Sequence, residues 1–277
     1  MKRTLSLVLS LIMILGILVS MPVTVSAATS GTTGDCTWSL DGTVLTISGS
    51  GEMEDYDEYG SLMHHFYYAP WKYENITEII IEDGVTYIGN YAFSGCDTLS
   101  VTIPNSVKSI GAYAFNCCDL VSVVIPDGVT DIGMYCFRYC TNLASVTIPD
   151  SVTNIGVYAF MDCTGLREVD WNANLESVPN DIFYNAGSKG EGIEVVFGNE
   201  AKKIPANLFN VSNDSYSNNV TSVIVSGNVT SIGSNAFKYC KNLESVVLPN
   251  SIIDIGDFAF YNCNSITHVN IPDSVTS

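Results

Sequence analysis

VTDIGMYCFRYCTNLASVTIPDS, residues 129–151, is one copy of a phrase that recurs along this chain of 277 residues. Successive copies are separated by 22, 22, 23, 23, 26, 28, 23 and 23 residues. The copies begin at Val85, Val107, Val129, Val152, Leu175, Ala201, Val229, Ile252 and Val275. Repeats of about 20–50 residues are typical of solenoids and propellers, and a propeller blade needs about 40 residues. The period therefore predicts a solenoid with one coil per repeat.

The apolar positions of the phrase predict how each coil is built. The shared pattern is V-x-x-I-G-x-x-A-F-x-x-C-x-x-L-x-x-V-x-I-P. Near its end Val146 and Ile148 alternate with polar neighbours, which is the period of a half-buried strand. Ser145 and Thr147 then lie on the outward face of that strand. Pro149 ends the strand because proline has no backbone N–H to donate.

Two further pieces complete the coil. Ile132 and Gly133 are expected to form a second short extended piece followed by a turn. Residues 135–140 carry apolar side chains at 136, 137 and 140, a spacing that favours a short helix or 3₁₀ turn. One coil has too little apolar surface to fold alone, but stacked coils share one core. We therefore predict an α/β repeat protein whose coils combine short strands with short helical or 3₁₀ turns.

The repeats occupy residues 85–277 and stop three residues into a ninth copy. This region corresponds to about eight complete coils. An open last coil would expose a strand edge and core side chains, which repeat proteins cover with a polar capping unit. We expect the sequence to be a piece of a longer protein for this reason.

The first 27 residues have the features of a secretory signal peptide. A basic start precedes a mostly apolar run over residues 5–19, and residues 25–27 (Val-Ser-Ala) suit a signal peptidase. The apolar run is short for a transmembrane helix and contains two serines. We expect export with cleavage near Ala27, and a secreted or cell-surface location.

The charge balance excludes some partners. The chain carries 29 acidic and 11 basic side chains, a formal net charge of −18. Such a surface repels phosphate backbones and anionic lipid heads. We expect no nucleic-acid partner, no membrane insertion after removal of the signal peptide, and a monomeric protein that needs no cofactor.

Six of the nine cysteines lie eleven residues after the start of their repeat: Cys96, Cys118, Cys140, Cys163, Cys240 and Cys263. In an alternating core this column predicts small buried thiols that stay reduced. Parallel thiols with three histidines in the chain do not supply the convergent ligands of a zinc site. We therefore expect no metal. Cys136 takes an alanine position and is expected in the core, which leaves Cys36 and Cys117 as the accessible thiols.

The repeat phrase resembles the BspA-like (treponemal-type) leucine-rich repeats of bacterial surface proteins. The resemblance covers residues 85–277 in six near-regular units. It implies a curved leucine-rich-repeat solenoid, exported or surface-displayed, that is used in adhesion or recognition and has no catalytic residues. The segments CTWSLDGTVLTISGSGEMEDY and APWKYENITEIIIEDG are similar to the capping segment that often precedes such arrays. The resemblance therefore implies a small β-rich cap over residues 28–84.

The outward strand face is the first candidate for a ligand site. Most of its positions carry small side chains, but the two middle rows carry Glu168, Asp170 and Glu194, beside Trp171. Both rows adjoin longer insertions at 185–192 and 210–219, whose Gly, Ser and Asn content predicts protruding loops. Departures from the repeat pattern that gather at one place in a regular array favour a ligand-binding site there. The alternative is neutral sequence variation in a repeat that tolerates substitution. Trp171 occupies the position of an inward isoleucine, so it is the weak member.

A column of tyrosines is the second candidate. Tyr91, Tyr113, Tyr135 and Tyr158 recur at one position of the phrase. Aromatic rings with a polar tip suit wet interfaces with sugars or peptides. The alternative is a ladder of rings that covers the turns.

Three functions fit these features. The sequence favours a non-enzymatic binding or adhesion module for a protein or glycan ligand. The second is a targeting or substrate-binding arm of a larger secreted enzyme, for example a carbohydrate- or protein-degrading one, whose catalytic domain lies outside this chain. The third is a structural spacer.

Overall fold

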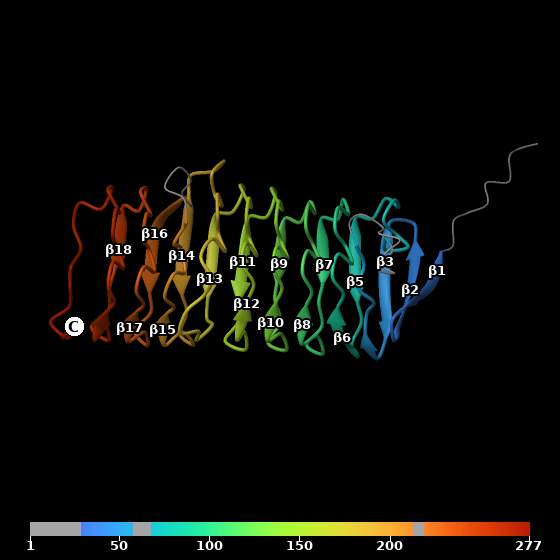
Figure 1. Ribbon diagram of the computed structural model, residues 1–277, viewed down its shortest axis with the longest axis horizontal. Helices are drawn as coiled ribbons and strands as arrows, with labels where there is room; N and C mark the ends of the chain where they lie inside the picture. Colours follow the sequence, from blue (N-terminus) through green and yellow to red (C-terminus); the bar gives the residue numbers. More distant parts are fainter. Residues whose placement is uncertain (1–28, 58–67, 213–218) are drawn as a thin grey trace, which may run out of the picture.

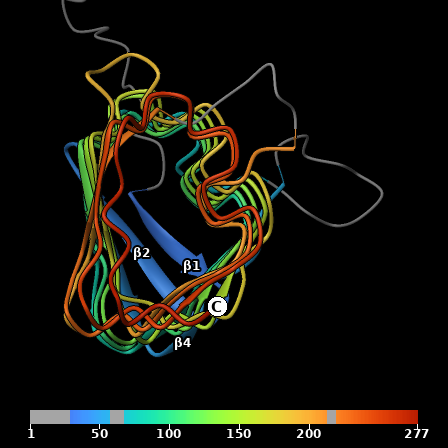
Figure 2. The same ribbon diagram turned by 90° about the vertical axis from the view of Figure 1, so that its left-hand side faces the viewer.

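The computed structural model describes residues 29–57, 68–212 and 219–277. The predicted signal peptide lies outside these residues. In Figure 1 the coils stand side by side in one row, and in the end-on view of Figure 2 they superpose on a common outline. Within the described ranges the structure contains strands and turns and no helix, hence no helix that could cross a membrane.

The strands of the first coils and of the segment before them are β1 (Ser30–Thr33), β2 (Cys36–Asp41), β3 (Val44–Gly49), β4 (Gly51–Glu52), β5 (Glu78–Ile81), β6 (Val85–Ile88), β7 (Ser100–Thr102), β8 (Ser109–Ile110), β9 (Ser122–Val124) and β10 (Asp131–Ile132). Those of the later coils are β11 (Ser145–Ile148), β12 (Asn154–Ile155), β13 (Glu168–Trp171), β14 (Ile193–Phe197), β15 (Lys203–Ile204), β16 (Val220–Val225), β17 (Ser231–Ile232), β18 (Ser245–Val247) and β19 (Asp254–Ile255).

Most coils contribute one strand to each of two rows of parallel strands. One row contains the six-stranded sheet β9-β11-β13-β14-β16-β18, and the other contains β4-β6-β8-β10-β12 and then β15-β17-β19. The register places equivalent residues side by side, so that Val146 lies between Val123 and Val169. All three side chains are buried. The predicted solenoid, in which each copy of the phrase packs on the next, is confirmed.

The segment predicted as a separate cap is continuous with the stack. β1, β2 and β3 pair antiparallel, as a meander. β3 then pairs in parallel with β5, and β5 with β7, so the coil stacking begins before residue 85. The role of residues 28–84 as a cap stays a prediction.

A ladder of phenylalanine rings runs through the core. Phe137 stacks on Phe115 and Phe160, with ring centroids 5.4 and 5.3 Å apart and interplanar angles of 2° and 4°. The same stacking continues to Phe93 at one end and to Phe183 and beyond at the other. Each ring fills the space between its two equivalents, so the core is continuous from coil to coil.

Residues 134–139 form turns, so the helix or 3₁₀ turn predicted over residues 135–140 is not confirmed. Tyr135 and Tyr139 have φ values of 55° and 58°, in the left-handed region, which interrupts a right-handed helix. The N–H groups of Tyr135, Phe137 and Tyr139 instead donate to carbonyls of the next coil, at 3.2, 2.8 and 2.9 Å. Besides the two rows of parallel strands, the turn therefore provides a third set of backbone hydrogen bonds between neighbouring coils.

The glycine that precedes this turn allows coils to approach closely. A Cβ atom on Gly133 would lie 2.5 Å from the backbone N of Ala112 and from the carbonyl carbon of Gly111. Real Cβ atoms do not approach backbone atoms so closely, and only glycine leaves this space empty. The recurring Ile-Gly pair of the phrase thus reflects backbone contact between neighbouring coils.

The cysteine column lies beside the phenylalanine ladder. Five of its six thiols are buried and Cys263 is half-buried, and none of the nine cysteines forms a disulfide. Cys118, Cys140 and Cys163 each donate an S–H group to the carbonyl of a phenylalanine in the preceding coil, at 3.1 Å. Burial raises the pKa of Cys96 and Cys140 to about 12. The prediction of small buried thiols holds for these five.

Of the three cysteines outside the column, Cys136 is buried in the core as predicted. The other two differ from each other. Cys117 is exposed, as expected. Cys36 is wrongly predicted as accessible, because it lies in β2 with 1% of its surface exposed and donates its thiol proton to the Gly51 carbonyl. Burial raises its pKa as well.

We expect iodoacetamide at neutral pH to modify one thiol of the native protein, that of Cys117. The column thiols are protonated and shielded, and even half-buried Cys263 has a pKa raised to about 11 by burial. Peptide mass spectrometry after brief alkylation locates the label, and Cys117→Ser should abolish it. Rapid labelling of Cys118 or Cys140 without denaturant would contradict the buried-thiol assignment.

Candidate binding face

The outward side chains of β9, β11, β13, β14, β16 and β18 form one continuous surface, here called the sheet face. Parallel pairing aligns these side chains in rows across the coils. Glu168 lies beside Glu194 in the register, with Ser145 and Ser222 next to them on either side. Because adjacent strands are about 4.8 Å apart, two carboxylates occupy neighbouring positions in one row.

The structure brings the predicted acidic residues together on this face. Glu168 and Glu194 are exposed, and Asp170 is half-buried. The Ser222 hydroxyl donates to Glu194 at 3.3 Å, and the Asn172 amide donates to Asp170 at 3.2 Å. No basic side chain forms a salt bridge with the three carboxylates in the described part of the chain. They are therefore available to cationic or hydrogen-bond-donating groups of a ligand.

Trp171 does not belong to this surface. It is 0% exposed, and its indole N–H donates to the Ala173 carbonyl at 2.9 Å. The register pairs Trp171 with Ile148 and Phe197, both inward residues. Strand alternation puts the residue after Asp170 inside, so the prediction of a ligand contact at Trp171 is wrong.

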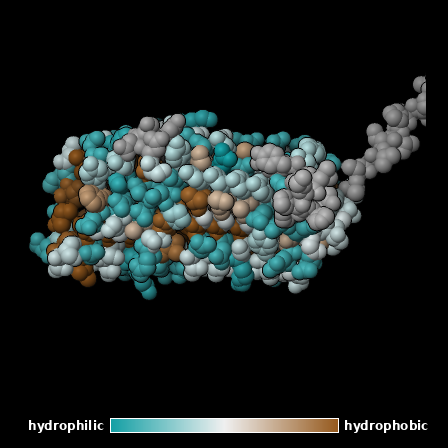
Figure 3. Space-filling view, viewed as in Figure 1, coloured by the Kyte–Doolittle hydropathy of each residue, from teal (hydrophilic) through white to brown (hydrophobic). Residues whose placement is uncertain are grey.

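Aliphatic side chains share the sheet face with the carboxylates. Val124 is 69% exposed, Ile224 45% and Val247 64%, and each occupies the same outward position of its strand. Apolar surface is exposed elsewhere as well: Figure 3 shows it along the middle of the view and at the left-hand end of the array, where the last coil lies. The sheet face thus carries both carboxylates without a salt bridge in the described residues and exposed aliphatic side chains, so it offers polar and apolar contacts to a ligand.

The loop of residues 185–192 borders the sheet face. Its backbone is anchored to the preceding coil, because Gly187 and Lys189 donate to the carbonyls of Cys163 and Thr164 at 3.0 Å each. A hollow of about 470 Å³ lies beside it, lined by Arg167, Lys189, Gly190 and Glu191.

The second predicted loop, 210–219, includes residues 213–218, which lie outside the described residues. Its start is fixed by Asp181, whose carboxylate accepts hydrogen bonds from the Ser212 backbone N–H at 2.7 Å and hydroxyl at 2.6 Å. Asp181 itself is buried. This buried polar contact ties the loop to the preceding coil.

The tyrosine column forms a regular stack. The rings of Tyr91, Tyr113, Tyr135 and Tyr158 follow one another at centroid distances of 4.5, 4.7 and 5.0 Å, with interplanar angles of 6°, 20° and 15°. All four are half-buried. Each ring therefore presents an edge to solvent while its faces contact the neighbouring rings. Arg138 lies over Tyr135 and over Tyr139, 5.2 and 4.4 Å from the ring centroids.

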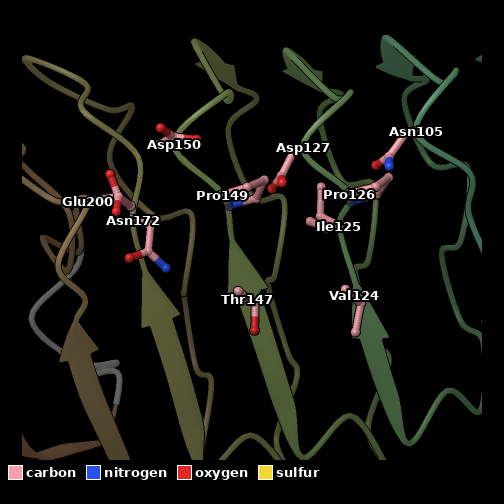
Figure 4. A pocket seen from close by; sticks show the side chains of 10 residues that line it. All are labelled: Asn105, Val124, Ile125, Pro126, Asp127, Thr147, Pro149, Asp150, Asn172 and Glu200. Atoms are coloured by element: carbon pink, nitrogen blue, oxygen red, sulfur yellow. The ribbon is translucent and has the colours of Figure 1, made fainter.

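A groove at the carboxyl ends of β9, β11 and β13 was not predicted from the sequence. It has a volume of about 610 Å³ and adjoins the sheet face through Val124 and Thr147. Figure 4 shows it crossing several coils. Its lining residues are Asn105, Val124, Ile125, Pro126, Asp127, Thr147, Pro149, Asp150, Asn172 and Glu200. The signal in the sequence is the Asp or Asn that follows the proline of each regular repeat, as in IPN, IPD and LPN.

Comparison with solved structures finds leucine-rich-repeat proteins from bacteria. A leucine-rich repeat protein from Eubacterium ventriosum is 21% identical, with 89% of this chain and 92% of that chain covered and a TM-score of 0.42. A leucine rich repeat protein of T. pallidum is 20% identical, with 85% and 90% covered and a TM-score of 0.44. A leucine rich cell surface protein of Faecalibacterium prausnitzii is 17% identical, with 87% and 94% covered and a TM-score of 0.34. No curated protein matches.

The family model of the BspA type leucine rich repeat region matches residues 66–189 and 202–277, in six copies. These two stretches make up well over half of the chain, and they contain most of the strands described above, β1–β4 and β14 excepted. Proteins of this family and fold are typically non-catalytic repeat domains. The chain belongs to the family of BspA-type leucine-rich-repeat proteins.

Proposed function

We propose that this protein is an exported or cell-surface binding module, without enzymatic activity, that recognises a protein or glycan ligand through its sheet face. Membership of the leucine-rich-repeat family supports a binding role, because solenoids of this kind present extended surfaces to partners. The signal-peptide features of the first 27 residues support export. The similar protein of F. prausnitzii is described as a cell surface protein.

The observation that carries this proposal is the row formed by Glu168 and Glu194. Two carboxylates lie side by side on neighbouring strands, exposed and without a cationic partner in the described ranges. Like charges at directly opposed positions disfavour folding. A ligand that supplies positive charge or hydroxyl donors would offset this repulsion, since hydrogen bonds to carboxylates are about twice as strong as neutral ones.

The proposal is tested with a ligand panel and a triple variant, Glu168→Ala, Asp170→Ala and Glu194→Ala. Purified protein is incubated with immobilised matrix proteins and with polysaccharides to find a ligand. We expect the triple variant to bind that ligand at least about tenfold more weakly, because charged hydrogen bonds contribute roughly 1.5–3 kcal/mol each. Far-ultraviolet circular dichroism should show an unchanged fold, because none of the three side chains is in the core.

A charge-matched control carries Glu52→Ala, Asp254→Ala and Asp257→Ala. These three side chains are exposed and lie away from the sheet face. The control should keep its affinity. Equal affinity of both variants and the unmodified protein would move the site elsewhere, first to the tyrosine column. No binding across the whole panel would favour a structural spacer.

A further inference from the structure

The groove beside the sheet face is built by the same short sequence in consecutive coils. Asn105, Asp127 and Asp150 each follow the proline that ends a strand of their coil. Figure 4 shows Pro126 and Pro149 on neighbouring coils, with Asp127 and Asp150 close by, in a row that Asn172 and Glu200 continue. Each of these coils therefore contributes an Asp, Asn or Glu side chain to the groove along the axis of the stack.

The carboxylates of the groove have no partners of their own. Asp127, Asp150 and Glu200 are exposed, and no hydrogen bond or ion pair engages their side-chain oxygens in the described residues. Among the described residues, no lysine, arginine or histidine lines the groove. Because field lines concentrate in a concave surface lined by one sign of charge, this groove is a strong attractor of cations on a protein of net charge −18.

The remaining described lining combines the polar side chains of Asn105, Thr147 and Asn172 with apolar ones. Val124, Pro126 and Pro149 supply hydrocarbon surface, and no tryptophan, tyrosine or phenylalanine of the described ranges lines the groove. Sugar rings in protein sites pack on aromatic faces, which this groove does not offer. Aliphatic side chains beside carboxylates suit an extended peptide, in which neighbouring side chains point to opposite sides and basic residues can alternate with aliphatic ones.

We propose that this groove binds an extended segment of a partner protein in which lysine or arginine side chains alternate with aliphatic ones. The basic groups contact Asp127, Asp150 and Glu200, and the aliphatic ones pack on Val124 and the two prolines. This inference rests on the proposed binding function and names the chemistry of the partner and a second contact area next to the sheet face.

The test uses a fluorescein-labelled peptide of alternating lysine and valine, with fluorescence anisotropy as the readout. The groove variant carries Asp127→Asn and Asp150→Asn, which keep side-chain volume and remove two charges. The control variant carries Asp254→Asn and Asp257→Asn, which remove the same charge from exposed positions far along the stack. We expect about tenfold weaker binding by the groove variant and less than about twofold change in the control.

Added salt should weaken the binding of the unmodified protein, and a peptide of alternating glutamate and valine should not bind. An equal loss of peptide affinity in the groove variant and the control variant would show that the peptide is attracted by the net charge of the protein alone. That result would overturn the inference. Unchanged binding by the groove variant, or no peptide binding at all, would also overturn it. A neutral polysaccharide whose binding depends on Asp127 and Asp150 would overturn the assignment of a peptide.

Failure of this inference is distinguishable from failure of the proposed function. If the triple variant at Glu168, Asp170 and Glu194 loses a panel ligand while the peptide does not bind, the binding function stands and the peptide assignment falls. If the panel gives no ligand and the peptide also fails to bind, both fall. Peptide binding that depends on the groove supports this inference and a binding role, while the sheet face is tested by the triple variant alone.

Discussion

Phe137→Ala is expected to lower the free energy of unfolding by about 3–5 kcal/mol, the range for truncation of a buried aromatic residue. The ring is 0% exposed and lies between Phe115 and Phe160 in near-parallel stacks. Its removal takes apolar surface from the core and also leaves both neighbouring rings without a contact on one face. The backbone of the coils is held by hydrogen bonds on three sides, so it cannot collapse to fill the gap.

The measurement is urea unfolding followed by circular dichroism. Met134→Ala is the matched control, because Met134 lies in the same coil with 42% of its surface exposed. The control should change the free energy of unfolding by less than about 0.5 kcal/mol. If Phe137→Ala stays within about 1 kcal/mol of the unmodified protein, the ring ladder is not a main source of stability.

Alkaline pH is expected to destabilise the fold through the buried thiols. Burial raises the pKa of the Cys140 thiol from an ordinary 9.0 to about 12. Below pH 9 the thiol is protonated in folded and unfolded chains, so its contribution to stability is fully present. As pH rises from 9 to 12 the unfolded chain loses this proton first, which favours unfolding by roughly 4 kcal/mol at pH 12 for one such thiol.

Cys140→Ala isolates this effect. Alanine is a natural choice, since Ala186 occupies the equivalent position of a divergent coil and is buried there. The free energy of unfolding is measured with urea in the presence of reductant, at about pH 8 and about pH 10.5. Between these two pH values the variant should lose about 2 kcal/mol less of its free energy of unfolding than the unmodified protein. Tyrosines also titrate in this range, and burial raises the pKa of Tyr56 to about 12. Their contribution is common to both proteins, so equal losses in the two would contradict the role assigned to the thiol.

The strands were predictable because their pattern is simple. Val146 and Ile148 alternate with Ser145 and Thr147 in the sequence, and in β11 the first pair is buried and the second is not. A period of two identifies a strand from a few residues. The recurrence then predicts which residues meet, because a parallel stack in register places each residue next to its own equivalent.

The turn was not predictable in the same way. Residues 136, 137 and 140 are inward, as a helical spacing would place them, but two left-handed residues at 135 and 139 produce that arrangement instead. Tyrosine rarely adopts such a conformation, so its presence at these positions gives no local signal. Hydrogen bonds to the neighbouring coil compensate the strain of the left-handed backbone at residues 135 and 139. The sequence of a single repeat contains no information on these contacts.

The candidate site was predictable in part. Strand alternation places Glu168, Asp170 and Glu194 on the outward face, and the structure aligns Glu168 with Glu194. The groove was missed because its residues belong to different coils and each alone is a common turn residue. Only the stacking of Asp127 and Asp150 beyond adjacent prolines creates a concave surface.

The position of the three tryptophans gives the chain two separate optical reporters. Trp38 and Trp71 lie against each other near the start of the array, with ring centroids 5.6 Å apart. Trp171 lies alone in the middle coils, sealed from water. Coils of a solenoid contact only their neighbours and can open independently. When Trp38 and Trp71 are replaced by phenylalanine, the wavelength of the Trp171 fluorescence maximum reports water entry at the centre of the array. In the unmodified protein the fluorescence of Trp38 and Trp71 also responds to opening of the N-terminal coils. Comparing the two proteins therefore distinguishes opening at the N-terminal end from opening at the centre.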